Sequence, residues 1–475
     1  MVCYKAFHAG RAGLVRVIDE SYIRKLISDH AKISFDACAQ HLLQELSIIV
    51  CHTEEIPASA KGLFIPDNLV FSVDCDFETW DCFGVDFSSP SPILNKLSGQ
   101  WSRNELFPWL LVEKGGDLVS LDFDFLGFVG HFLVGLDQKD GDKVDVHGRQ
   151  NYEANTLVRL GLQGVPILNI ALFAILSVAK GWKNSCIAVD PSCHVLPPRL
   201  VLSHDCDQLR GNDIYTQSIR LFRFFRDAVS LKFSAFRHLK FLALNFVKPT
   251  KYYFKDALYM KALEERRGFK SVFYLLNGRG GRFGARSGGS LIGEFVRKLD
   301  GNSEVGIHYN YQYSQNLALL EAQLTELNSY VGHGLVGGRA HYLAFDRKMS
   351  FKNIQHCGIR LDESVGFSSH SAFRVGYAGA YILEKESESS KALYELPLLF
   401  MDSNVIDPLE KSVVISMLSK VEAVGGVVTF LFHPGLGSNP EFKEFMGEYE
   451  NYLSYFSENK YRSLLPRDLV ELLDE

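Results

Sequence analysis

The sequence predicts an α/β protein whose larger part consists of parallel strands joined by helices, and three observations support this. After Pro198, short apolar segments alternate with amphipathic ones, which is the pattern of β/α units. Polar clusters follow several apolar segments, and α/β folds place their chemistry at the carboxyl ends of strands. Hydrophobic residues make up 47% of the 475 residues, enough to bury substantial cores. At about 150 residues per domain, this length suggests two to four domains.

Charge and cysteine content narrow the class of protein. The formal net charge is -6, so the overall charge does not indicate a nucleic-acid or anionic-membrane partner. None of the nine cysteines forms a C-x-x-C pair, which argues against a zinc ribbon or disulfide framework and favours reduced thiols in the cytoplasm. The N-terminal residues contain no apolar core of signal-peptide length, so no export signal is expected.

The amino-terminal part is expected to form a smaller α/β domain of unknown role, residues 1–190. Helical periodicity runs from Ile18 to Cys51, and a strand-like segment, "NLVFSVDCDF", follows at residues 68–77. Asp74 and Asp76 in that segment are expected to lie in a solvated acidic turn. The apolar run at residues 165–182 is shorter than the ~20 residues that span a bilayer, so it is expected to be a buried helix. Prolines between residues 183 and 199 favour a boundary there.

The carboxy-terminal part, residues 191–475, supplies the alternating elements in order. The predicted strands are residues 200–205, 271–276, 304–309, 337–345, 394–401 and 427–435, and the predicted helices are residues 291–299, 316–331, 408–424 and 440–456. The glycine-rich stretch "NGRGGRFGARSGG", residues 277–289, lacks a phosphate-binding motif and is expected to be a flexible, arginine-bearing loop over the site. A basic aromatic segment, residues 221–248, is expected to be a core-packing helix with a cationic face. Contact with membranes or anionic glycans is the alternative.

Four polar clusters follow the predicted strands. The first, "SHDCD", carries His204, Asp205 and Asp207. Taken alone, its two carboxylates are more typical of a turn or helix cap than of a metal site. The others contain His308, then Arg339 with His341, then His433. Together these clusters offer what a hydrolytic metal site needs: ligands from several elements, a base and an acid.

The ordered segments "SHDCD", "EVGIHYNYQYS", "VGGRAHYLAFD", "IRLDESVGFSSHSAFRVG", "YELPLLFMD" and "GGVVTFLFHPG" resemble the polysaccharide deacetylase family, the NodB-homology carbohydrate esterases. More narrowly, they resemble a bacterial subgroup with an H-D-x-D first motif and an R-x-H-Y-L-x-F third motif. The resemblance covers about residues 198–475. It implies a distorted (β/α) barrel and the metal-dependent removal of an acetyl group from an amino sugar, with zinc as the expected ion.

The resemblance also implies roles for individual residues. Asp205 corresponds to the general base and His433 to the general acid, while Arg339 is expected to orient Asp205. Asp207 and His308 correspond to metal ligands. His204 is expected to support them rather than to bind the metal.

The chain departs from the family pattern at one ligand. The second histidine of the family's H-x-x-x-H motif is replaced by Gln312, a poor ligand for zinc. His341, two residues beyond Arg339, is the expected substitute. The alternative is a carbohydrate-binding or scaffold protein that keeps the fold without catalysis. For an active enzyme, the expected substrate is an N-acetylated sugar of a bacterial surface polysaccharide or its precursor.

Overall fold

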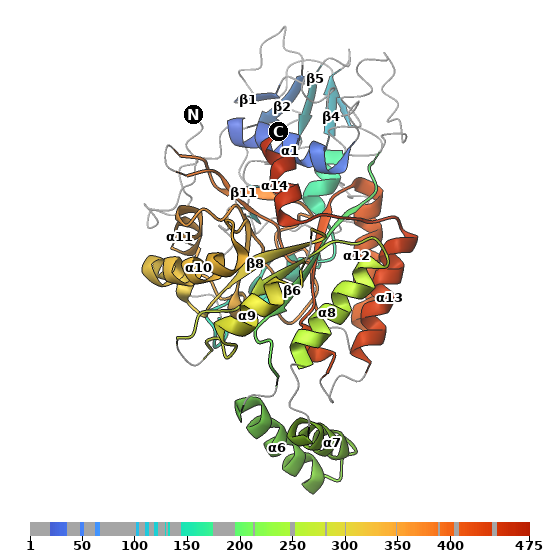
Figure 1. Ribbon diagram of the computed structural model, residues 1–475. Helices are drawn as coiled ribbons and strands as arrows, with labels where there is room; N and C mark the ends of the chain where they lie inside the picture. The colour runs from blue at the N-terminus through green and yellow to red at the C-terminus, as the bar shows by residue number, and fades with distance from the viewer. Residues whose placement is uncertain are drawn as a thin grey trace. The chain divides into compact units, whose positions relative to one another are not determined.

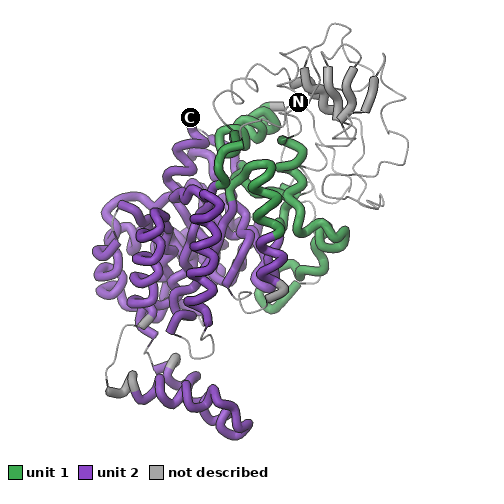
Figure 2. The backbone as a smooth tube through the Cα atoms, turned by 90° about the vertical axis from the view of Figure 1, so that its right-hand side faces the viewer, with its two compact units in different colours: residues 1–198, 373–381, 416–427 green, residues 199–372, 382–415, 428–475 purple. Residues whose placement is uncertain are grey.

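The computed structural model describes residues 20–35, 48–51, 62–66, 101–103, 110–113, 118–121, 129, 132–133, 144–173, 195–211, 214–247, 252–280, 283–299, 301–347, 349–387, 390–402, 408–438 and 444–475. The chain divides into two compact units (Figure 2). Unit 1 comprises residues 1–198, 373–381 and 416–427. Unit 2 comprises residues 199–372, 382–415 and 428–475, and it holds all the predicted site residues.

Unit 1 contains a five-stranded mixed sheet with the order β1-β2-β5-β4-β3. Its strands are β1 (Ile48–Cys51), β2 (Gly62–Pro66), β3 (Trp101–Arg103), β4 (Leu110–Glu113) and β5 (Leu118–Leu121). Helix α1 (Glu20–Ser34) precedes them. The helix predicted from Ile18 to Cys51 is therefore wrong at its end, because Ile48–Cys51 pairs in parallel with β2.

The rest of unit 1 is described in shorter pieces. A 3-10 turn, η2 (Tyr152–Ala154), leads into α4 (Thr156–Arg159), whose first turn is capped by the side chain of Asn155. The predicted apolar helix is helical over residues 167–173. Residues 165 and 166 precede the helix. The segment 68–77, with Asp74 and Asp76, and the stretch 174–194 lie outside the described residues.

The sheet of unit 2 has ten strands, nine of them in the order β11-β12-β10-β9-β8-β7-β6-β14-β13, and β15 pairs with β6. The strands are β6 (Arg199–Cys206), β7 (Ser271–Leu275), β8 (Ser303–Tyr309), β9 (Gly337–Ala340), β10 (Leu361–Asp362), β11 (Tyr381–Glu384), β12 (Leu393–Glu395), β13 (Phe400–Met401), β14 (Val427–Leu431) and β15 (Arg462–Ser463). Neighbouring strands from β6 to β10 pair in parallel. This confirms the predicted α/β class.

A short irregular segment links the two ends of this sheet. The backbone N–H of Leu396 donates to the carbonyl of Asp362 on β10, and three residues later that of Leu399 donates to Thr429 on β14. Pro397 lies between them and has no N–H to donate. The predicted strand at residues 394–401 is therefore two strands, β12 and β13. They lie on opposite sides of an interruption in the sheet. The sheet is a barrel interrupted at this point, in agreement with the expected distorted (β/α) barrel.

Helices lie around the barrel (Figure 1). They are α8 (Tyr252–Glu265), α9 (Gly289–Val296), α10 (Leu317–Val331), α11 (Ser350–His356), α12 (Pro408–Val424), α13 (Phe445–Glu458) and α14 (Pro466–Asp474). The predicted helices correspond to α9, α10, α12 and α13. Between β6 and α8, residues 221–248 were expected to form one core helix. Instead, α6 (Ile214–Val229) and α7 (Ser234–Val247) form a hairpin whose apolar side chains are largely exposed, so the core-packing prediction is wrong.

Among the described residues, no helix is both long and apolar enough to cross a membrane.

Candidate metal site

The polar clusters meet at one edge of the barrel because their strands are parallel neighbours. In the paired strands, Asp205 on β6 is opposite Tyr274 on β7, and His308 on β8 is opposite Arg339 on β9. Asp207 follows the end of β6 and His341 follows the end of β9. The carboxyl ends of these strands therefore bring the predicted ligands together.

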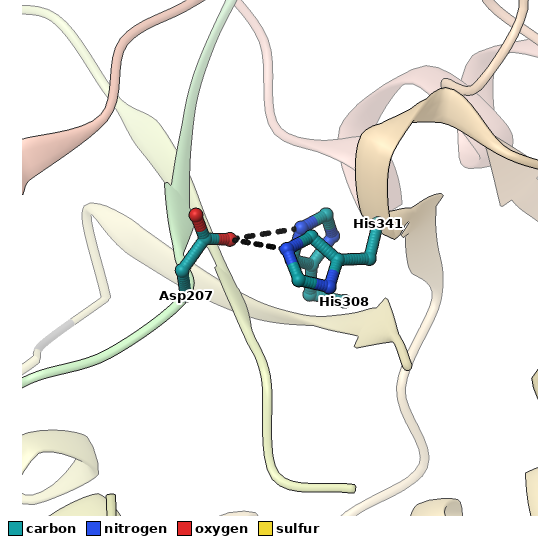
Figure 3. A group of neighbouring side chains, drawn as sticks. All are labelled: Asp207, His308 and His341. Carbon is teal, nitrogen blue, oxygen red and sulfur yellow. Dashed lines mark ion pairs between the residues drawn. The ribbon is translucent and has the colours of Figure 1, made fainter. Parts of the chain in front are cut away.

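Asp207, His308 and His341 form the candidate metal site (Figure 3). Each offers one ligand atom, and the three atoms lie within 4.8 Å of one another. Oδ1 of Asp207 is 3.2 Å from Nε2 of His308 and 3.5 Å from Nε2 of His341. Ligands about 2.1 Å from a tetrahedral zinc ion lie about 3.4 Å apart, so these separations suit one ion between the three atoms.

The hydrogen bonds around the cluster also fit a cation. Oδ1 of Asp207 is buried and makes no hydrogen bond, although the side chain as a whole is 42% exposed. Nδ1 of His308 lies 3.0 Å from the carbonyl oxygen of Arg339. If Nδ1 carries the proton and donates it to this carbonyl, the lone pair of Nε2 points toward Asp207. That arrangement is typical of a metal-binding histidine with a backbone acceptor behind it.

His341 occupies the third position because the chain turns sharply after β9. Residues His341–Leu343 form a 3-10 turn, η4, in which Tyr342 has a φ of 61° and Leu343 a φ of 52°. The strand predicted at residues 337–345 therefore ends at Ala340. Burial lowers the pKa of His341 to about 4, despite the nearby Asp207, so its imidazole is neutral at pH 7 and able to bind a metal.

Gln312 takes no part in this cluster. It is exposed, with a left-handed φ of 62°, at the start of η3 (Tyr313–Gln315). Within the described residues, His341 and not Gln312 groups with Asp207 and His308. Two neighbouring tyrosines have separate structural roles. Tyr309 is fully buried, and the hydroxyl of Tyr313 accepts a hydrogen bond from the Gly280 N–H.

Arg339 is fully buried and holds two carboxylates in place. Its Nη1 donates to Oδ1 of Asp205 at 2.8 Å, and its Nη2 donates to Oε2 of Glu363 at 2.5 Å. Nη2 also donates to the Ser203 hydroxyl, and Nε donates to the Glu363 carbonyl. The hydroxyl of Tyr274 donates to the other oxygen of Glu363. These hydrogen bonds fix the guanidinium, which in turn fixes one oxygen of Asp205.

The surroundings of Asp205 keep it ionised. Burial alone raises the pKa of this carboxyl, but Arg339 and His308 outweigh burial and lower it. Its Oδ2 lies 3.6 Å from Nε2 of His308, beside the candidate ligands. Asp205 is thus a charged carboxylate with one oxygen held by Arg339 and the other next to the cluster.

His433 is paired with Asp402. Its Nδ1 lies 2.8 Å from Oδ1 of Asp402, and its backbone N–H donates to the other oxygen of that carboxylate. Burial lowers the pKa of His433, but Asp402, with Asp207 and Asp205 further off, raises it to about 10. His433 follows β14, the sheet neighbour of β6, so a protonated imidazole lies at the same edge as Asp205.

Behind the cluster, His204 is fully buried and supports the strands. Its Nδ1 lies 3.1 Å from the carbonyl oxygen of Phe432, and its Nε2 lies 2.7 Å from Oε1 of Glu264 on α8. Glu264 also accepts hydrogen bonds from Ser271 and Tyr449. His204 therefore ties β6 to a helix and to the end of β14, which agrees with its expected supporting role.

Three acidic residues that pair with site residues were not predicted from the sequence: Asp402, Glu363 and Glu264. Asp402 directly follows an apolar run ending in Met401, and this position after a strand could have marked it as a candidate site residue. Glu363 likewise follows β10. Glu264 lies inside α8, where a glutamate is ordinary, and nothing in the local pattern distinguishes it.

Comparison of the sequence with models of protein families and with curated proteins gives no match. Several solved structures are similar at low identity. A Mycobacterium smegmatis protein assigned as a polysaccharide deacetylase is 12% identical, covering 59% of this chain and 91% of its own, with a TM-score of 0.39. A polysaccharide deacetylase from Bacillus cereus is 9% identical, covering 56% and 92%, with a TM-score of 0.28. A 4-alpha-glucanotransferase from Thermococcus litoralis is 12% identical, covering 58% and 40%, with a TM-score of 0.34. Fold similarity at this level leaves the reaction open.

Proposed function

We propose that this protein is a metal-dependent hydrolase that removes an N-acetyl group from an amino sugar. One observation carries the proposal: three ligand atoms, from Asp207, His308 and His341, lie within 4.8 Å of one another beside a charged Asp205. Two imidazoles and one carboxylate that leave a position open are a ligand set used by catalytic zinc ions. Zinc is therefore the ion we propose.

Asp207, His308 and His341 would hold the ion. A divalent cation bound there supplies a Lewis acid for the amide carbonyl and for a water molecule. His308 is kept in a ligand-competent orientation by the carbonyl of Arg339, 3.0 Å from its Nδ1. The exposed remainder of the Asp207 side chain leaves this side of the cluster open to a substrate.

Asp205 is suited to act as the general base. Arg339 occupies its Oδ1, so Oδ2 is the oxygen that accepts a proton from the attacking water. Because Arg339 stabilises the carboxylate form, the base is ionised before substrate arrives.

His433 is suited to act as the general acid. Asp402 holds its imidazole in the protonated form, and the proton on Nε2 can pass to the departing amine. With Asp205 accepting one proton and His433 donating another, hydrolysis yields a free amine and acetate.

The substrate class we propose is an N-acetylated sugar of a bacterial surface polysaccharide or its precursor. A cytoplasmic location belongs to the same proposal. It is supported by the cysteine spacing and by two free thiols among the described residues, those of Cys206 and Cys357.

The rival function is carbohydrate binding without catalysis. It is favoured by the presence of Gln312 in place of the second histidine of the H-x-x-x-H motif.

One assay distinguishes the two functions. Purified protein is incubated with zinc and a panel of N-acetylated amino sugars and oligosaccharides, and released acetate and free amine are both measured. We expect acetate release by the wild type, a decrease in kcat of about 10²–10⁴ in Asp205→Asn, and unchanged metal content in that variant. A metal-loaded wild type that binds these sugars and releases no acetate would establish the rival.

A further inference from the structure

Helices α6 and α7 form a hairpin (Figure 1). The burial of its polar and apolar side chains is reversed relative to an ordinary core element. Three charged or polar side chains are buried between the helices: Arg220, Asp227 and His238. The Arg220 guanidinium lies 3.7 Å from the centre of the Phe241 ring, and Asp227 accepts a hydrogen bond from Ser234. The hairpin is therefore held together by polar and cation–π contacts on its inner side.

Its apolar side chains face outward instead. On α6, Leu221, Phe222, Phe225 and Val229 follow a spacing that places them on one stripe of the helix, and all four are exposed. The side chain of Phe222, for example, is 69% exposed. Burying such a stripe is what normally stabilises an amphipathic helix, so this stripe has the composition of a contact surface.

The stripe continues through the turn into α7. Leu231 is 94% exposed and Phe233 is 74% exposed in the turn, and Phe236 and Leu239 follow on the outer side of α7. The two helices and their turn thus present a continuous series of exposed phenylalanine, leucine and valine side chains.

The charge of the hairpin is opposite to that of the whole chain. Residues 214–247 contain six lysines or arginines and one aspartate, whereas the formal net charge of the protein is -6. Lys232 and Lys240, two of the six, are exposed beside the apolar stripe. Cationic side chains next to exposed aromatic ones are typical of helices that lie in a membrane interface.

We propose that the α6–α7 hairpin docks this protein onto the surface of an anionic lipid bilayer. The phenylalanine and leucine side chains enter the boundary between headgroups and acyl chains, and exposed cations such as Lys232 and Lys240 contact lipid phosphates. A second copy of the chain fits the surface less well, because it would bring the exposed cations of one hairpin against those of the other. Nucleic acid or an anionic glycan would match the charges but leave the apolar stripe in water. The proposal is independent of the deacetylase function.

Vesicle flotation tests the proposal with the full-length protein. We expect the wild type to float with phosphatidylcholine vesicles that contain about a third phosphatidylglycerol, to float poorly with pure phosphatidylcholine, and to dissociate at high salt. The double variant Phe222→Ser/Phe225→Ser should lower the bound fraction about tenfold. The double variant Lys232→Glu/Lys240→Glu should weaken binding to anionic vesicles while leaving the apolar stripe intact.

Leu319→Ser/Val413→Ser is the matched control, because both side chains are exposed apolar residues on other helices, α10 and α12. It should float like the wild type. Thermal unfolding is followed for every variant, and the lysine variant alone decides the outcome if the phenylalanine variant is unstable. Equal flotation with neutral and anionic vesicles, or no flotation, would overturn the proposal. So would a dimer in sedimentation that the phenylalanine variant lacks, since it would assign the surface to a second copy.

Discussion

Asp205 and Asp207 are two residues apart but lie in different electrostatic surroundings. Asp205 is fixed by the buried Arg339, whereas Oδ1 of Asp207 faces two imidazoles and makes no hydrogen bond. Residues i and i+2 of a strand share a face, so both carboxylates lie on the same side of β6. Because the strand ends at Cys206, Asp205 lies within it and Asp207 lies just past its end. The proposed base and ligand roles thus follow from position rather than from residue type.

Asp402 should control the pH range in which His433 acts. The pKa of His433 is raised to about 10, so the imidazole is protonated below that pH and the acid function is lost as pH rises through it. Asp402→Asn removes the charge that holds the proton, so the alkaline fall in kcat should move to lower pH. The measurement is a pH profile of acetate release. Asp474→Asn, which alters a carboxylate paired with Arg360, is the control and should keep the wild-type profile.

Arg339 should contribute strongly to stability as well as to orientation. Arg339→Met leaves Asp205 and Glu363 buried without their cation, and breaking buried pairs of this kind costs about 3–5 kcal/mol. Urea unfolding at pH 7 measures the loss. Arg360→Met, which removes a pair with the partly exposed Asp474, should cost about 1 kcal/mol or less. Equal losses in the two variants would contradict the role assigned to Arg339.

The parallel strands could be predicted from the sequence, but the residues at which they end could not. β6, β7 and β8 are fully or almost fully buried runs, and such runs are visible in the sequence. β9 ends early because Tyr342 and Leu343 adopt positive φ, which neither residue type indicates. The break between β12 and β13 could have been inferred from Pro397. His341 reaches the candidate metal site because of the turn after β9.

Gly306 allows β7, β8 and β9 to pack closely. A Cβ atom at this position would meet the ring of Tyr274 and lie 2.9 Å from the carbonyl oxygen of Gly337. Gly306→Ala should therefore lower the free energy of unfolding by about 1–3 kcal/mol. Gly301→Ala is the matched control, because a Cβ there meets nothing within 4 Å, and its effect should stay within about 0.5 kcal/mol. Chemical denaturation of both variants compares the two sites, and similar stabilities would refute the packing argument.

For the molecule as a whole, the sequence predicted the α/β barrel but misjudged the hairpin. The prediction for residues 221–248 assumed that an apolar stripe packs inward, and that assumption fails when the polar side chains Arg220 and Asp227 form the inner contact instead. Overall charge was similarly uninformative, because a net charge of -6 conceals a local cationic element. The expected domain boundary near residue 190 stays a prediction, although the two compact units meet in the chain at residues 198 and 199.

The acid sensitivity of the molecule should depend in part on His30, which is fully buried in α1 and within hydrogen-bonding distance of the Tyr377 hydroxyl. Burial lowers its pKa to about 3, from 6.5 in the unfolded chain. The neutral form is therefore favoured in the folded state, and this stability is present above pH 6.5 and lost as pH falls toward 3. Between pH 7 and pH 5, the wild type should lose about 2 kcal/mol more than His30→Gln in urea unfolding. An identical pH dependence in both proteins would exclude this role.

Asp207, His308 and His341 are proposed to bind one metal ion, without a contribution from Gln312. The most direct measurement is zinc titration by calorimetry of metal-free protein, supported by elemental analysis after dialysis. We predict about one equivalent of zinc in the wild type and in Gln312→Ala, and no measurable binding in Asp207→Ala or His341→Ala. Circular dichroism verifies that each variant is folded. A wild type that binds no zinc under these conditions, or a His341→Ala variant that binds it as well as the wild type, would contradict this ligand assignment.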